Sequence, residues 1–126
     1  MTARIVGPVV VAAVADVLAV LVFAALGRGS HAEALDIAGL AGTAAPFLAA
    51  LLVSWLAGRA WRAPTRMRTG AVVWVGTTVV GLAVRAALTH RLPPTFVLIT
   101  AVSLAVLLFG WRGITLAVTH ARPRTT

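Results

Sequence analysis

The residues from Ile5 to Leu26 form an apolar run that a single charged residue, Asp16, interrupts. At about 1.5 Å of rise per residue, a helix of this length reaches roughly 33 Å, which is enough to cross the hydrocarbon core of a bilayer. An ionisable side chain near the middle of such a helix is costly and normally faces protein or water instead of lipid. The segment therefore predicts a membrane-spanning helix in which Asp16 needs a partner.

The composition also indicates a membrane protein. Of the 126 residues, 60% are hydrophobic and only 11% are charged, whereas a soluble domain carries about 25% charged residues. The absence of cysteine excludes disulfides and thiolate chemistry. A net charge of +8 would suggest nucleic-acid binding in a soluble chain, but here the arginines lie at the ends of apolar runs, as topology determinants do. We therefore expect the lipid bilayer, and no nucleic acid, as a partner.

Four apolar segments predict an all-α fold, a bundle of four transmembrane helices that forms one domain. The expected spans are residues 5–26, 37–58, 70–88 and 95–118. The first span has some features of a signal peptide, but its length and Asp16 favour an uncleaved anchor. The second span contains Pro46, which either only kinks the helix or exposes the carbonyl of Gly42 to a cavity.

The connection after the first span contains metal-ligand and capping residues. Ser30-His31-Ala32-Glu33 has the spacing of a capping box and predicts that the second helix begins near Ser30. His31, Glu33 and Asp36 do not share one helical face at this spacing, so we expect no metal and no cofactor. Haem ligation by His31 and His90 is the one geometrically conceivable alternative.

The arginines are distributed unevenly between the two ends of the predicted bundle. Four spans place both termini and the 59–68 connection on one side, with Arg4, Arg59, Arg62, Arg66, Arg68, Arg112, Arg122 and Arg124. The other side holds Arg28, Arg85 and Arg91. By the positive-inside rule, we expect both termini to be cytoplasmic. The expected location is the plasma membrane of the cell. The four tryptophans, at 55, 61, 74 and 111, fall on the same half, as an interfacial aromatic belt would.

A layer of polar residues is expected between the midplane and the opposite side. Its candidate site residues are Asp16, Arg85, Thr78 and Ser103. Counting along the helices separates Asp16 from Arg85 by roughly 6 Å in depth, within reach of an arginine side chain. We therefore predict that Asp16 and Arg85 form an ion pair that stabilises the bundle, with hydroxyls bonding across helices. The alternative is a small transporter or channel that uses Asp16 as a protonatable or cation-binding group.

The residues inside the spans disfavour an enzyme. A hydrolase would need a nucleophile with a base beside it, and no histidine lies inside a span. An aspartyl mechanism would need a second carboxylate next to Asp16. A second copy of the chain is a further expected partner, because small residues in the third and fourth spans allow close helix approach.

Several different short motifs along the chain together resemble the pattern of a known family. The residues that carry the match are Asp16, Arg28, His31, Pro46, Arg85 and Arg112, together with neighbours such as Phe47, Trp55, Gly81 and Trp111. In these the chain resembles a family of small four-span membrane proteins known only as domain of unknown function 3054 (DUF3054). The resemblance covers nearly the whole chain and implies an integral membrane helical protein. It implies no activity, because the family has none assigned.

Overall fold

Four long helices make up the computed structural model, which describes residues 2–30 and 37–121 and, within them, the side chains of 7–27 and 37–119. They are α1 (Thr2–Ser30), α2 (Ile37–Gly58), α3 (Met67–Thr89) and α4 (Pro94–Ala121), and a short 3-10 helix, η1 (Ala60–Arg62), follows α2. Each long helix contains a segment long and apolar enough to cross a membrane. The predicted all-α fold with four spans is confirmed.

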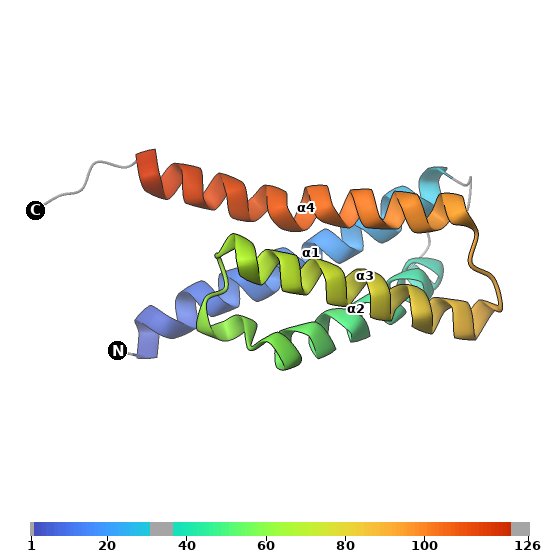
Figure 1. The fold of residues 1–126 in the computed structure, drawn as a ribbon, viewed down its shortest axis with the longest axis horizontal. Coiled ribbons are helices and arrows are strands. Elements are labelled where there is room, and N and C mark those ends of the chain that lie inside the picture. Colours follow the sequence, from blue (N-terminus) through green and yellow to red (C-terminus); the bar gives the residue numbers. More distant parts are fainter. Residues whose placement is uncertain (1, 31–36, 122–126) are drawn as a thin grey trace, which may run out of the picture.

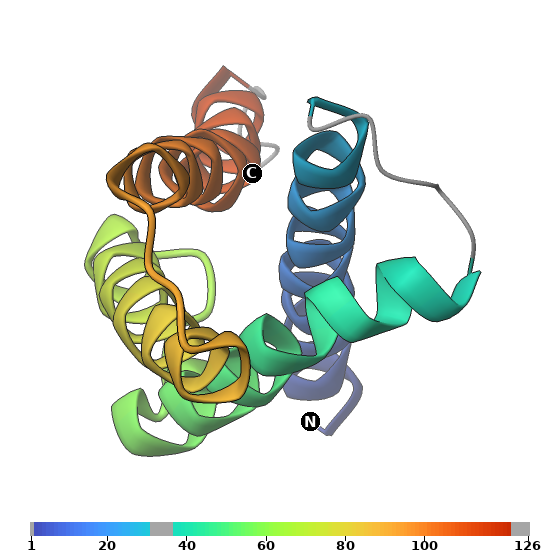
Figure 2. The ribbon, with the colours of Figure 1, turned by 90° about the vertical axis from the view of Figure 1, so that its right-hand side faces the viewer.

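The helices surround a common centre in the order α1, α2, α3, α4 (Figures 1 and 2). Each helix packs against its neighbours in this ring, and α4 closes the ring by packing against α1. As a result, α1 and α3 lie on opposite sides of the bundle (Figure 2). This order decides which polar side chains can meet.

The helices differ in length. The outer pair in sequence, α1 and α4, has 29 and 28 residues, whereas α2 and α3 have 22 and 23. The start of α1 and the end of α4 therefore extend past the connection between α2 and α3 (Figure 1). Ser30 is the last residue of α1, so the prediction that a helix begins there is wrong; α1 continues to this position in spite of Gly27 and Gly29, which are weak helix formers. His31, Glu33 and Asp36 lie outside the described residues.

Two left-handed residues end the middle helices. Arg59 has φ 51° and stands directly after α2, and His90 has φ 57° and stands directly after α3. The His90 N–H donates to the carbonyl of Ala86 at 2.8 Å, which satisfies one of the last free carbonyls of α3. Pro94 then begins α4, where a first-turn proline costs no intrahelical bond.

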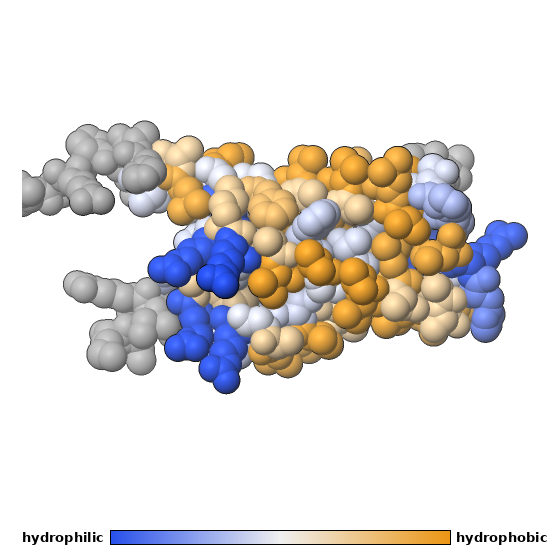
Figure 3. All heavy atoms as spheres, in the orientation of Figure 1, coloured by the Kyte–Doolittle hydropathy of each residue, from blue (hydrophilic) through white to orange (hydrophobic). Residues whose placement is uncertain are grey.

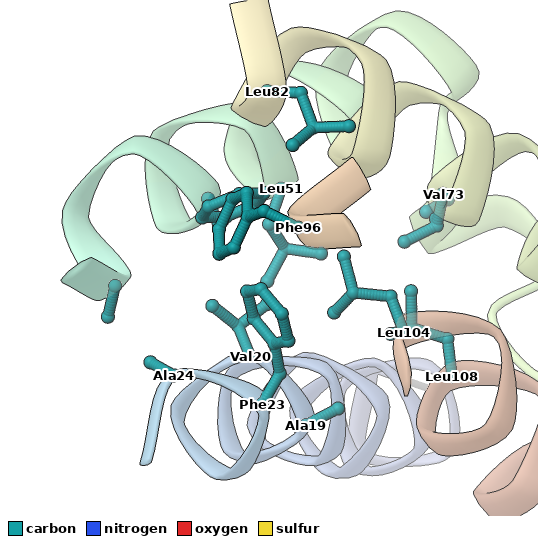
Figure 4. Packing of buried hydrophobic residues seen from close by; sticks show 13 residues of the cluster. Ala19, Val20, Phe23, Ala24, Leu51, Val73, Leu82, Phe96, Leu104 and Leu108 are labelled. Atoms are coloured by element: carbon teal, nitrogen blue, oxygen red, sulfur yellow. The ribbon is translucent and has the colours of Figure 1, made fainter. Parts of the chain in front are cut away.

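Apolar side chains from all four helices fill the centre of the bundle (Figure 4). Three phenyl rings meet there: the Phe23 and Phe47 centroids lie 5.0 Å apart at 72°, and Phe96 lies 6.3 and 6.4 Å from them. Such edge-on geometry is the favoured one for aromatic pairs. Because lipid is as apolar as these side chains, close packing, and not the hydrophobic effect, is what holds spans together.

Candidate functional site

The main polar feature of the bundle is an ion pair between α1 and α4. Nη1 of Arg112 lies 2.8 Å from Oδ1 of Asp16, and Nη2 lies 2.8 Å from Oδ2, so the guanidinium donates a hydrogen bond to each carboxylate oxygen. Both side chains are 0% exposed. Bidentate contacts of this kind are the strongest and most specific that arginine makes with a carboxylate.

Two tryptophans complete the coordination of Asp16. The Trp111 indole N–H donates to Oδ1 at 2.8 Å, and the Trp55 indole N–H donates to Oδ2 at 2.8 Å. Each carboxylate oxygen therefore accepts two hydrogen bonds. Since an ionised carboxylate offers about four acceptor positions, Asp16 has all of them filled by protein groups.

Arg112 is nearly as fully engaged. Its Nε donates to the Pro64 carbonyl at 2.9 Å, and Nη1 also donates to the Leu108 carbonyl at 3.2 Å. With the two bonds to Asp16, four of its five N–H groups have partners. The guanidinium carbon also lies 4.5 Å from the centre of the Trp111 ring, a cation–π contact.

Every helix of the ring reaches this pair, which we call the Asp16–Arg112 clasp. α1 supplies Asp16, α2 supplies Trp55, and α4 supplies Trp111 and Arg112. α3 approaches through Gly70, where an added Cβ would lie 2.9 Å from Cδ of Arg112. The Pro64 carbonyl adds the α2–α3 connection, so the clasp lies at the end of the bundle that carries this connection.

The prediction that Arg85 pairs with Asp16 is wrong. The Arg85 guanidinium lies over the Phe96 ring at 4.4 Å, in contact with α4 near the opposite end of the bundle. Arg85 belongs to α3, which faces α1 across the ring (Figure 2). Arg112 reaches Asp16 instead because α4 is adjacent to α1 and because helix side chains lean toward the N-terminus, which in α4 points from the arginine-rich end toward the bilayer centre.

The other predicted site residues do not join the clasp. Thr78 is 8% exposed, Ser103 is half-buried on α4, and Pro46 is buried within α2. The hydroxyls of Thr77, Thr78 and Thr100 have no hydrogen-bond partner within the described ranges, although cross-helix bonding was predicted for this layer. The side chains of Arg28 and His31 lie outside the described ones.

Trp55 and Trp111 belong to the site, although the sequence predicts an interfacial belt for them. Their indole N–H groups point inward to Asp16, and that of Trp74 donates to the Ala101 carbonyl of α4 at 2.8 Å. Of the four tryptophans, Trp61 is 41% exposed, as a belt residue would be. A buried acid in an apolar span needs donors without extra charge, and tryptophan supplies one from an otherwise apolar ring.

Comparison with known proteins identifies one family. A family model described as "Protein of unknown function (DUF3054)" matches residues 13–115. This range begins before Asp16 and ends after Arg112, so it includes every side chain of the clasp. No curated protein and no solved structure matches the chain.

Proposed function

The chain belongs to the DUF3054 family of proteins of unknown function, and we propose that it is a plasma-membrane protein whose Asp16–Arg112 clasp is a structural lock on the four-helix bundle. The observation that carries this proposal is the full set of donors around Asp16. A carboxylate with every acceptor position occupied has none left for a metal cation. The clasp therefore favours stability over transport.

The same geometry supports a non-enzymatic role without a cofactor. Asp16 is the one acidic residue in the described ranges, and its donors hold it away from any substrate. General acid–base chemistry needs a group that can reach a reacting atom through at most one water. The partners we propose are lipid and, through other faces, a second copy of the chain.

A small transporter is the second candidate, and one observation favours it. Thr77, Thr78 and Thr100 are buried without a hydrogen-bond partner among the described residues. Leaving a buried hydroxyl unpaired costs about 1–3 kcal/mol, which a passing polar solute would recover. Thr100 stands twelve positions before Arg112, about 18 Å along α4. Because the acceptor positions of Asp16 are filled, a solute at Thr100 could bind Asp16 only after the clasp had opened.

Ion flux separates the two candidates. If the clasp is structural, proteoliposomes of the wild type should pass protons, Na⁺ and K⁺ no faster than protein-free vesicles, because Asp16 offers no free acceptor. The measurement is an internal pH or cation dye after an imposed gradient, with an ionophore as the positive control. Flux above the protein-free level that Thr100→Val reduces, at unchanged helicity, would replace the structural proposal by the transport one.

We propose that both termini and the α2–α3 connection face the cytoplasm. Arg112 is buried in the clasp and so does not count as a surface charge, but the sequence still predicts seven arginines for this side against three for the other. That difference remains a strong topology signal.

Labelling of single cysteines tests the orientation, because the chain has no cysteine of its own. With an impermeant maleimide on intact cells, Thr65→Cys should stay unlabelled until the membrane is opened. The matched control is Thr95→Cys at the exposed start of α4, which should be labelled from outside. Labelling of Thr65→Cys from outside, with Thr95→Cys protected, would reverse the orientation.

A further inference from the structure

We propose that the groove between α1 and α2 binds one anionic phospholipid, with an acyl chain in the groove and the headgroup phosphate on Arg59. The groove has a volume of about 380 Å³ and is lined by Ala13, Val17, Leu48, Leu51, Leu52 and Trp55. All six side chains are apolar apart from the indole N–H of Trp55, which is bonded to Asp16. The groove thus offers an acyl chain only apolar contacts.

Charge complementarity selects the headgroup. Leu48, Leu52 and Trp55 recur at steps of four and three along α2, and Arg59 follows Trp55 by four residues, just beyond the end of the helix. Arg59 is exposed and stands directly after the last turn of α2, so the groove points toward a cation at the membrane surface. Arg62, Arg66 and Arg68 are also exposed within the next nine positions. Figure 3 shows hydrophilic atoms at both ends of the bundle and a largely hydrophobic surface between them.

Guanidinium groups suit this role. Arginine binds phosphate oxygens through two parallel N–H groups, and clusters of basic residues beside a span attract anionic lipids by about 1 kcal/mol for each residue near the surface. A zwitterionic lipid has the same chains but offers no net charge to the cluster.

A second copy fits the groove less well. Two copies inserted in the same orientation and packed through their α1–α2 grooves would bring both arginine clusters together at one membrane surface. Like charges at such an interface are unfavourable. Asp16, the acidic side chain of the described residues, cannot offset them because it is already paired with Arg112. An anionic lipid instead neutralises the cluster.

Native mass spectrometry of the full chain tests the site. The protein, in a neutral detergent, is given equal amounts of phosphatidylglycerol and phosphatidylcholine with identical chains. We expect one phosphatidylglycerol to remain bound per chain under activation that removes phosphatidylcholine. Arg59→Gln should lower this selectivity about fivefold, the factor that corresponds to about 1 kcal/mol per arginine. Ala13→Phe, which fills the groove, should lower retention of both lipids.

Two matched variants serve as controls. Arg91→Gln removes an exposed arginine at the opposite end, and Ala49→Phe adds the same bulk to an exposed position of α2 outside the groove; both should retain lipid as the wild type does. Helicity by circular dichroism identifies any variant that fails to fold. If Ala13→Phe fails to fold, the comparison of Arg59→Gln with Arg91→Gln still tests the proposal. Equal retention of the two lipids, equal effects of the two arginine variants, or a dimer that Ala13→Phe dissociates would overturn the proposal.

Discussion

Replacing Asp16 by Asn is expected to destabilise the bundle by about 3–5 kcal/mol, the usual cost of removing one partner of a buried ion pair. The variant leaves the Arg112 guanidinium at 0% exposure with no negative charge beside it. Arg112→Gln should cost a similar amount, because Asp16 would then keep only the two indole donors. The measurement is the free energy of unfolding in mixed micelles with increasing denaturing detergent.

The double variant Asp16→Asn/Arg112→Gln should lose clearly less stability than the sum of the two single losses, since neither charge is then left alone. Arg85→Gln provides the matched control: its loss should add to that of Asp16→Asn, because Arg85 contacts Phe96 and not Asp16. A coupling between Asp16 and Arg85 as large as that between Asp16 and Arg112 would contradict the clasp.

The sequence predicts that Asp16 needs a partner, but it does not identify Arg112 as that partner as clearly. An acid in the middle of a 22-residue apolar run demands a basic or donor-rich partner in the protein, and that much follows from the cost of charge in lipid. The choice of Arg85 assumed that the spans begin level with one another. α1 and α4 instead extend past the α2–α3 connection, which brings Asp16 and Arg112 to the same depth.

A signal for the correct partner was nevertheless in the sequence. Arg112 lies inside the expected span of residues 95–118, with the apolar residues Ile114, Leu116 and Val118 still to follow. An arginine placed within a span, and not at its end, is itself a buried charge that needs a partner. Trp111 beside it is a second sign, because an indole can donate a hydrogen bond from an apolar ring.

The order of helices in the ring could not be predicted from the sequence. Hydropathy locates spans but does not say which spans are neighbours. That order places α1 and α3 on opposite sides of the ring, so Arg85 on α3 is not the partner of Asp16 on α1. The unpaired hydroxyls of Thr77 and Thr100 depend in the same way on rotamers and helix contacts that the pattern does not encode.

Gly81→Val is expected to give the second largest loss, because α2 and α3 pack closely where this glycine meets the Phe47 ring. A Cβ at position 81 would overlap Cδ1 of the Phe47 ring and lie 2.7 Å from Cε1 and 3.1 Å from Cγ. The ring cannot move aside easily, since it is fully buried against Phe23 and Phe96. Even Gly81→Ala should therefore cost about 1–3 kcal/mol, the range for overpacking a filled core, and the branched valine should cost more.

A pair of further variants separates steric overlap from a general effect of losing glycine. Gly110→Ala on α4 meets no atom within 4 Å and should leave stability unchanged or raise it by about 0.5–1 kcal/mol through helix propensity. Phe47→Leu shortens the obstructing side chain, so Gly81→Ala/Phe47→Leu should lose less stability than the sum of the two single changes. The free energy of unfolding is measured for each of these variants in the same way. If Gly81→Ala were as harmless as Gly110→Ala, the close approach of α2 and α3 at Phe47 would not be a determinant of the bundle.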